Sequence, residues 1–549
     1  MAPGRVARQL AAIALFTLLT AIMTWPQVKN LGTEASDHQD VYFNMWRFEW
    51  IAHAIATAPG RVLDGNIFYP ERRTLTFSDA MPVESAMAAP LLWAGVRPVL
   101  VHNLMLLAGI VLSGAGMFAL ARRLTGSTAA GLTAGIVFAF APYRFEHYMH
   151  MELQWIVWTP WAFWALHRMF ETGSRRSGAL VGLLVALQFM SSIYYGVFLA
   201  TLLGLVAVLL LITHGGESFR QRAVALAITG SVCFAFVLPY GLQYAITKRN
   251  IGGRPEEQVV MFSAKPSSYA VATPTSLLYG ERSRGRGRAE RRLFPGLLPV
   301  LLAVTGLLLR RPSREAIAYV AGLVAAFELS LGMYGFSYPP LYRHVPIFEG
   351  LRAPARLGVY VLFFLALLAA YGHAALEQSL LPQESSGSKR RLRGLLGGAI
   401  CAILILEYWV APLRLVAYPN TAPPLHAWLA RQPRGVVAEL PLAPSHLLPG
   451  DDPRYEYLST FHWMPSINGY SGYYPPSYLE RVHRLQTFPD PAATRVLQRA
   501  GVQYVVVHLS GYSAAEVGTI LYTLAANHAY TQLGRFDDGQ GPAAVYRLH

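Results

Sequence analysis

Two carboxylates that could act as a general base, Asp37 and Asp40, follow the first apolar segment of the sequence. A carboxylate next to partly desolvated aromatic side chains can accept a proton from an incoming hydroxyl group. Aspartate is also a favoured N-cap residue, so the alternative for Asp40 is that it only caps the helix expected at residues 40–56. Because Asp37 lies outside that helix, we predict Asp37 as the catalytic base and Asp40 as the second candidate.

A second polar stretch, residues 143–152, concentrates charged and metal-binding side chains between two apolar segments. Membrane insertion alone does not favour Arg144, Glu146 and two histidines in so short a loop. Glu146, His147 and His150 could bind a divalent ion such as Mg²⁺ or Mn²⁺ or contact an acceptor, although two histidines at i and i+3 are only a moderate metal signal. The alternative is that these side chains hydrogen-bond to lipid headgroups at the membrane surface.

Arginines gather in residues 342–356, just before another apolar segment. Guanidinium groups donate paired hydrogen bonds that match phosphate oxygens, and membrane-insertion statistics do not require arginine here. We therefore predict that Arg352 and Arg356 bind a lipid phosphate, with ordinary anchoring at the interface as the alternative.

An aromatic and amide-rich stretch in the C-terminal part of the chain could contact a sugar. Trp463 and Tyr470 could stack on a sugar face, and Asn468 could hydrogen-bond to its hydroxyl groups. Gly-rich aromatic loops also occur as ordinary packed turns, so both interpretations stay open at this point.

The elements that must position these residues are mostly apolar helices. Of the 549 residues, 53% are hydrophobic and only 14% are charged, whereas a soluble domain has about a quarter charged. The apolar residues form blocks of about 17–25 residues, the length that a helix needs to cross a hydrocarbon core of about 30 Å. This predicts an α-helical polytopic membrane protein with about eleven spans. The predicted spans are residues 8–25, 98–121, 127–142, 153–170, 178–191, 195–213, 222–244, 294–310, 315–334, 357–375 and 394–412.

The net charge of +15 indicates membrane topology rather than nucleic-acid binding. Arginine and lysine occur in short runs between apolar blocks instead of forming one basic face. When the spans are counted from a cytoplasmic N-terminus, every short basic loop falls on the cytoplasmic side. This predicts a cytoplasmic N-terminus and an extracytoplasmic C-terminal domain.

Two domains are expected. Residues 1–412 form a transmembrane domain with interfacial helices at residues 40–56 and 82–94 of the first outer loop. Residues 413–549 form a soluble α/β domain, because their composition changes to strand-like and shorter helical patterns. The strand-like segments are residues 436–440, 504–509 and 543–548, and the helical ones are residues 493–500 and 514–526.

Several classes of protein are disfavoured by missing motifs. The sequence has no phosphate-binding Gly-Lys-Ser/Thr loop, no dinucleotide fingerprint and no Gly-x-Ser-x-Gly motif, which argues against an ATP-driven pump or a serine hydrolase. Its two cysteines, Cys233 and Cys401, fall in predicted spans, so no disulfide framework is expected in the outer domain.

The order of several motifs resembles the GT-C class of integral membrane glycosyltransferases, whose bacterial members use polyprenyl-phosphate sugars. No single motif is diagnostic, but together they cover most of the membrane part. They are Asp37 and Asp40 in the first outer loop, residues 66–70 followed by Asp79, residues 121–126, residues 140–144 with His147 and His150, residues 293–296 and residues 351–356.

The resemblance implies a lipid-phosphate-sugar donor and an inverting displacement at the anomeric carbon, which needs one base rather than the paired carboxylates of glycoside hydrolysis. Carried over by position, Asp37 is the base. Arg352 and Arg356, with Arg144, stabilise the lipid-phosphate leaving group. The chain lacks the Asp-x-Asp or Glu-x-Asp pair of the best-known subgroups and has Glu-His at residues 146–147 instead, which makes a metal requirement doubtful.

We therefore expect a glycosyltransferase of a bacterial inner (plasma) membrane. Its partners would be a lipid-linked sugar donor, membrane lipids and a surface glycan, lipid or protein acceptor. The alternative is a transporter or flippase of lipid-linked glycans, which would need ionisable groups in broken helices near the bilayer midplane. Nearly all polar residues lie at one face instead, which favours the enzyme. A catalytically inert assembly protein is the third alternative.

Overall fold

The computed structural model describes residues 3–214, 218–380 and 387–549 of the chain, which forms two compact units. The first, here called the helical unit, consists of Met1–Lys29, Met105–Leu242 and Gly252–Leu413. The second, here called the α/β unit, consists of Asn30–Leu104, Gln243–Ile251 and Arg414–His549. Each unit therefore combines segments that are far apart in the sequence.

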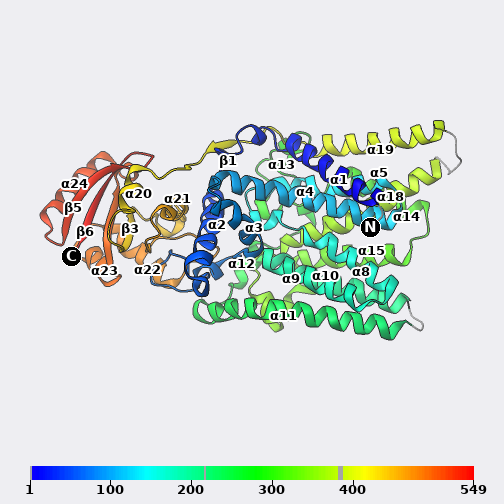
Figure 1. Ribbon diagram of the computed structural model, residues 1–549, viewed down its shortest axis with the longest axis horizontal. Helices are drawn as coiled ribbons and strands as arrows, with labels where there is room; N and C mark the ends of the chain where they lie inside the picture. Colours follow the sequence, from blue (N-terminus) through cyan, green and yellow to red (C-terminus); the bar gives the residue numbers. More distant parts are fainter. Residues whose placement is uncertain (1–2, 215–217, 381–386) are drawn as a thin grey trace. The chain divides into compact units, whose positions relative to one another are not determined.

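Long apolar helices make up most of the helical unit (Figure 1). Each predicted span overlaps one helix of 13 or more residues, so the hydropathy pattern located these helices correctly. The first residues of α4 and the last residues of α11 belong to the α/β unit. The helices are α1 (Pro3–Met23), α4 (Pro98–Thr125), α5 (Thr128–Phe140), α8 (Trp158–Thr172), α9 (Arg175–Ser191), α10 (Ile193–His214), α11 (Phe219–Ile251), α14 (Leu297–Leu309), α15 (Arg314–Ser330), α18 (Gly358–Leu380) and α19 (Gly387–Glu407).

In the described part of the chain, 4 helical segments are long and apolar enough to cross a membrane: Pro98–Thr125, Ile193–His214, Phe219–Ile251 and Pro354–Leu380. Other helices are shorter. Helices α5 and α14 have 13 residues each, which corresponds to about 20 Å, against about 30 Å for a hydrocarbon core. The long segments indicate a membrane protein, and the count of about eleven spans stays a prediction.

Helix α18 lies at the centre of the helical unit, where it packs against α5, α14 and α15. In its most apolar stretch 89% of the residues are buried inside the protein, against 11% for α11. Glycine brings α14 and α18 close together, because a Cβ atom on Gly372 would lie 1.7 Å from the carbonyl oxygen of Leu302. Small residues commonly allow such close approach between helices in membranes.

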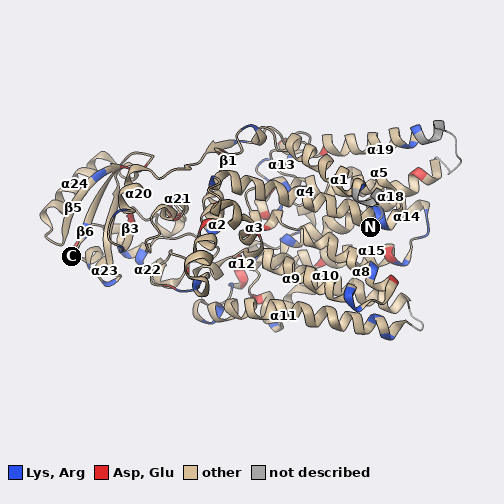
Figure 2. Cartoon of the chain, in the orientation of Figure 1, with Lys and Arg blue, Asp and Glu red and all other residues tan. Residues whose placement is uncertain are grey.

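The short basic connections between α4 and α5, between α8 and α9, and between α14 and α15 lie at one end of the helical unit (Figure 2). Arg123, in the last turn of α4, forms an ion pair with Glu171 at the end of α8. Arg314, at the start of α15, donates a hydrogen bond of 2.7 Å to the carbonyl oxygen of Thr213 in α10. These contacts bring the basic helix ends together, as the predicted topology requires. The cytoplasmic location of this end stays a prediction.

The α/β unit contains a 4-stranded sheet with the strand order β3-β4-β6-β5 (Figure 1). Strand β3 is parallel to β4, whereas β6 is antiparallel to both β4 and β5. The strands are β3 (Val436–Leu440), β4 (Val502–His508), β5 (Tyr530–Asp537) and β6 (Pro542–Leu548). The accompanying helices are α20 (Pro424–Leu429), α21 (Asp452–Leu458), α22 (Pro476–Arg484), α23 (Pro491–Arg499) and α24 (Ala514–Ala526).

The sequence patterns predict most of these elements. Strands β3, β4 and β6 and helices α23 and α24 are confirmed at the predicted positions. Strand β5 is not predicted, because it is an edge strand with many exposed polar residues and little apolar alternation. Buried valines of the sheet, including Val437, Val506 and Val545, pack against Leu425 of α20 in the core.

The first polar loop also belongs to the α/β unit. It contains β1 (Glu34–Ser36), α2 (Gln39–Thr57) and α3 (Pro82–Trp93), so both predicted loop helices are present. Strand β1 pairs antiparallel with β2 (Leu415–Ala417), and α2 packs against α21. Most side chains of α2 are buried, including Asp40, Trp46 and Arg47. The position of α2 at a membrane interface stays a prediction.

Candidate functional site

Asp40 lies in the first turn of α2, but it is not the N-cap. The N-cap is His38, whose Nδ1 accepts the Asp40 amide N–H at 3.1 Å, so the interpretation of Asp40 as a cap is wrong. Asp40 is 9% exposed, and its carboxylate accepts a hydrogen bond from the Tyr470 hydroxyl. The fold thus brings together two predicted site residues that are 430 positions apart.

Asp37 is accessible at the start of the same loop. Its side chain is 45% exposed, and its Oδ2 lies 3.1 Å from Nη2 of Arg414, whose side chain is 84% exposed. The pairing of β1 with β2 brings these two residues together, since Ser36 lies opposite Leu415. An exposed ion pair holds a carboxylate only weakly, so the Asp37 carboxylate stays available to other partners.

Tyr418 fixes the backbone between the two carboxylates. Its hydroxyl donates to the carbonyl oxygen of Ser36 at 2.8 Å and accepts the amide N–H of His38 at 3.3 Å. Burial raises the pKa of Tyr418, so the phenol stays neutral and able to donate. Sequence reasoning misses this residue because no local pattern relates it to a loop that lies 380 positions earlier.

Two of the predicted acceptor-binding residues pack inside the α/β unit. Trp463 stacks on His53 of α2, with 4.0 Å between the ring centroids. Asn468 is buried, and its side chain both accepts the amide N–H of Glu439 and donates to the carbonyl oxygen of Glu439, at 2.8 Å in each case. These two hydrogen bonds tie the Asn468 side chain to the backbone of β3, so it is not available to a sugar. Tyr470 is the predicted acceptor residue that lies beside a candidate base.

In the helical unit, Arg356 pairs with Glu290, a residue that sequence reasoning does not single out. The Nε and Nη2 atoms of Arg356 lie 3.2 Å and 2.8 Å from Oε1 of Glu290. Both side chains are buried, and the guanidinium lies 4.8 Å from the ring centroid of Tyr194. The Arg- and Gly-rich stretch around Glu290 predicts a flexible, solvated loop, whereas Ala289–Arg291 forms a 3-10 turn.

Glu290 is ionised, and the neighbouring His147 is neutral. Burial alone would raise the pKa of Glu290, but the Arg356 guanidinium beside it holds that pKa below its ordinary range. Burial lowers the pKa of His147 to about 3. Its Nε2 lies 3.7 Å from Oε2 of Glu290, the oxygen that also accepts a hydrogen bond of 3.4 Å from Nε of Arg356.

Arg352 is placed differently from Arg356. Its amide donates to the Tyr194 hydroxyl at 2.9 Å, and its guanidinium lies 5.5 Å from the ring centroid of Phe262. Within the ranges that the structure describes, no carboxylate forms an ion pair with this guanidinium. Of the two arginines predicted to bind phosphate, Arg352 is therefore the one whose charge is not already neutralised.

Arg144 holds the loop between α6 (Pro142–Glu146) and α7 (Met151–Gln154). It is 1% exposed, and it donates to the carbonyl oxygens of Leu153 and Gln154 at 2.9 Å each. Gln154 in turn donates to the carbonyl oxygen of Arg144. These contacts give Arg144 a positioning role in the loop.

The predicted ligands Glu146, His147 and His150 face different partners. Oε1 of Glu146 accepts a hydrogen bond of 2.7 Å from Nη1 of Arg292, while His147 faces Glu290. The rings of His147 and His150 are 5.5 Å apart between centroids. Among the described residues, this loop does not bring three ligand atoms within 4.8 Å of one another.

A cleft of about 740 Å³ in the α/β unit is lined largely by α22 and α23. Its charged lining residues are Arg481, Arg484, Arg495, Arg499, Glu71 and Glu480. Arg481 is 8% exposed, and its Nη2 has no hydrogen-bond partner among the described residues. Guanidinium donors match phosphate and carboxylate oxygens, so this cleft can bind an anionic group.

The fold is similar to that of solved membrane glycosyltransferases. The arabinofuranosyltransferase AftD from Mycobacteria matches with a TM-score of 0.63 and 15% identity over 99% of this chain. The match covers 40% of that protein, so the present chain spans less than half of its length. The Archaeoglobus fulgidus oligosaccharyltransferase matches with a TM-score of 0.50 and 14% identity, over 91% of this chain and 69% of that one.

These similarities and the apolar helices define an integral membrane protein with the GT-C fold. Residues 9–375 match the family described as "Domain of unknown function (DUF6311)", and the chain belongs to this family. No curated protein matches the sequence.

Proposed function

We propose that the chain is a membrane glycosyltransferase that moves a sugar from a polyprenyl-phosphate donor to an extracytoplasmic glycan, lipid or protein acceptor. The observation that carries the proposal is the similarity of almost the whole chain to an arabinofuranosyltransferase, with 99% of its residues covered. In this proposal Asp37 would be the base and Arg352 would bind the donor phosphate. The location would be a bacterial inner membrane, with the N-terminus in the cytoplasm.

Arg352 is the principal ligand of the donor phosphate in this proposal. Its guanidinium is partly accessible and has no carboxylate partner among the described residues, so it can form a paired hydrogen bond with phosphate oxygens. Arg356 is a secondary ligand in this proposal, because Glu290 already occupies two of its nitrogens. Arg144 acts indirectly by holding its loop.

Asp37 is the proposed general base. It would remove the proton from the acceptor hydroxyl while the acceptor oxygen forms a bond to the anomeric carbon. The bond between that carbon and the phosphate oxygen breaks with inversion, and its electron pair leaves with the lipid phosphate. Asp37 is more accessible than Asp40, whose carboxylate is held by Tyr470. In this proposal Asp40 and Tyr418 position the loop that carries the base.

The acceptor would carry phosphate or carboxylate groups. This part of the proposal rests on the arginine-lined cleft. There Nη2 of the buried Arg481 has no hydrogen-bond partner among the described residues. Exposed arginines nearby, such as Arg484 and Arg495, would bind further anionic groups of a surface glycan. The cleft does not depend on Trp463 or Asn468, which pack inside the unit.

The test is incubation of the purified full chain in detergent with radiolabelled polyprenyl-phosphate sugars and with neutral or anionic glycan acceptors. Transfer of label to an acceptor would support the enzyme. Movement of intact lipid-linked sugar between leaflets of a vesicle, without cleavage, would support the flippase instead. The acceptor proposal predicts that Arg484→Gln weakens binding of the anionic glycan, whereas Arg535→Gln, an equally exposed change outside the cleft, does not.

A further inference from the structure

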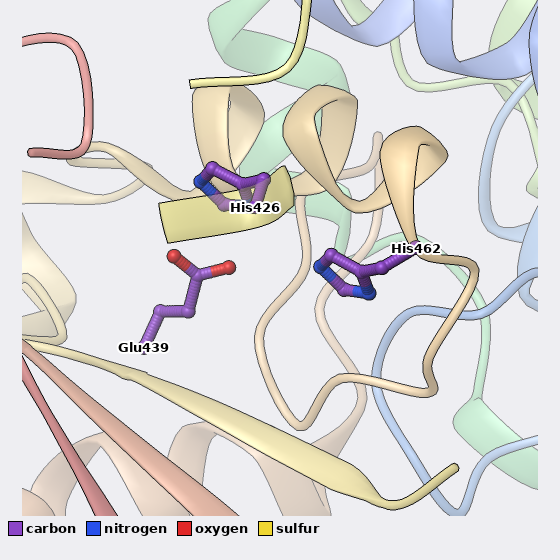
Figure 3. Close-up of side chains that lie close together, drawn as sticks. All are labelled: His426, Glu439 and His462. Atoms are coloured by element: carbon purple, nitrogen blue, oxygen red, sulfur yellow. The ribbon is translucent and has the colours of Figure 1, made fainter. Parts of the chain in front are cut away.

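Three side chains of the α/β unit, His426, Glu439 and His462, point toward one another (Figure 3). Each offers one ligand atom, and these atoms all lie within 4.8 Å of one another. His426 belongs to α20, Glu439 to β3, and His462 to the loop that follows the 3-10 turn Ser459–Phe461. The cluster therefore joins three parts of the unit, and neither the proposed donor site nor the proposed base uses it.

His426 lacks the hydrogen bonds that a buried imidazole normally makes. It is 0% exposed, and neither ring nitrogen has a hydrogen-bond partner among the described residues. Leaving buried donors and acceptors unpaired is costly, so such groups point to a missing ligand. Burial lowers the pKa of His426 well below its ordinary value, and the neutral ring is the form that binds metal ions.

Glu439 is oriented by a second layer of polar residues. It is 1% exposed, and its Oε2 accepts a hydrogen bond of 2.8 Å from Nε2 of His508. The other ring nitrogen of His508 contacts the carboxylate of Asp538. Partners of this kind fix the direction of a metal-binding side chain. One carboxylate oxygen of Glu439 lies within 4.8 Å of the ligand nitrogens of the two histidines.

His462 presents its Nε2 to the cluster. Its Nδ1 accepts the amide N–H of Met464 at 3.1 Å, and its Nε2 has no hydrogen-bond partner among the described residues. The neutral ring therefore carries its proton on Nε2. A cation that binds Nε2 replaces this proton, which moves to Nδ1, and Nδ1 can then no longer accept the Met464 amide N–H. The exchange of that amide therefore reports on binding.

We propose that His426, Glu439 and His462 bind a divalent cation of the Zn²⁺ class. Two imidazole nitrogens and one carboxylate oxygen are a ligand set that Zn²⁺ uses, whereas Mg²⁺ and Mn²⁺ prefer oxygen ligands. Donor atoms around tetrahedral Zn²⁺ lie about 3.3 Å apart, so ligand atoms that lie within 4.8 Å of one another must move closer by at most about 1.5 Å. Three protein ligands leave a fourth position for a solvent molecule, and the ion would link α20, β3 and the loop after α21.

The experiment measures metal binding by the full-length protein in detergent after dialysis against a chelator. We expect one Zn²⁺ per chain by elemental analysis, and visible absorption bands of a four-coordinate ion after titration with Co²⁺. Glu439→Gln and His462→Gln should each weaken Zn²⁺ binding by about 100-fold or more. His462 is only partly buried, so its variant is the less disruptive of the two.

The matched control is His483→Ala, because His483 is exposed on α22 and lies outside the cluster. This variant should bind Zn²⁺ as tightly as the unaltered chain. The peptide that contains Met464 should also change its hydrogen-exchange rate when Zn²⁺ is added. Absence of stoichiometric Zn²⁺ in the unaltered protein, or undiminished binding in a folded His462→Gln variant, would overturn the proposal. Neither readout depends on glycosyl transfer.

Discussion

Arg356 and Glu290 form a buried ion pair in the helical unit, with 2.8 Å between Nη2 and Oε1. This ion pair distinguishes Arg356 from Arg352, although the sequence alone predicts the same role for both. Arg356 is already neutralised by a carboxylate, whereas Arg352 has its guanidinium over the ring of Phe262. The two residues should therefore respond differently to substitution.

Arg352→Lys should weaken binding of the sugar donor by about tenfold or more, because lysine keeps the charge but cannot donate the paired hydrogen bonds of a guanidinium. The measurement is the affinity of the purified protein for a fluorescent polyprenyl-phosphate sugar. Arg343→Lys is the control, since Arg343 lies in the same segment but pairs with Glu256 at an exposed position. Equal donor affinity in both variants would refute the assignment of Arg352.

Glu290→Gln should destabilise the helical unit by about 3 kcal/mol, because it leaves the buried charge of Arg356 without its carboxylate. The measurement is the thermal unfolding of the detergent-purified protein. Glu256→Gln removes a carboxylate whose side chain is 52% exposed and should have little effect. If the two variants unfold at the same temperature, the ion pair does not stabilise the fold.

Asp37→Asn should reduce glycosyl transfer by about 10²- to 10⁴-fold while donor binding and expression stay nearly normal. Asparagine keeps the size of the side chain but cannot accept the proton. The rate is measured with saturating labelled donor. Asp40→Asn should cost less, since asparagine can still accept the hydrogen bond of Tyr470. The reverse order of effects would move the base to Asp40, and full activity of both variants would remove the first loop from the mechanism.

A reporter that is active only outside the cytoplasm should work when fused after His549 and fail when inserted at Gly387. The expectation follows from the short basic connections between helices, which share one end of the helical unit. Alkaline phosphatase fusions in a bacterial host provide the measurement. If the reporter is active at Gly387 and inactive at His549, the orientation is the reverse of the predicted one. Asp37 would then lie in the cytoplasm, which is the wrong compartment for the proposed reaction.

Glu49→Gln should flatten the dependence of stability on pH. Burial raises the pKa of Glu49 from 4.5 to about 7 in the folded chain. Between these values the folded state holds a proton that the unfolded state releases, so stability falls as the pH rises from about 4.5 to about 7. The unfolding temperature at pH 5 and pH 8 gives the measurement. Glu480→Gln, at an exposed position, should leave the difference unchanged.

Hydropathy and local periodicity were sufficient to locate the long helices and three of the four strands in the larger sheet. Apolar blocks predict both α4 and α18, because membrane-spanning helices and helices buried in a protein core are both rich in apolar residues. The same patterns place Asp37 and Arg352 in polar loops. They cannot show that Glu290 neutralises Arg356, because that pairing depends on how a loop rich in arginine folds back. They cannot identify Tyr418 either, since its partners lie hundreds of positions away.

The pairing of β1 with β2 cannot form early in synthesis. Ser36 emerges from the ribosome long before its partner Leu415. At about 5–20 residues per second, the interval is roughly 20–80 s. During this time Asp37 has neither Arg414 beside it nor Tyr418 to fix its backbone. The nascent protein therefore gains its arranged carboxylates only after the long helices from α4 to α19 have been made.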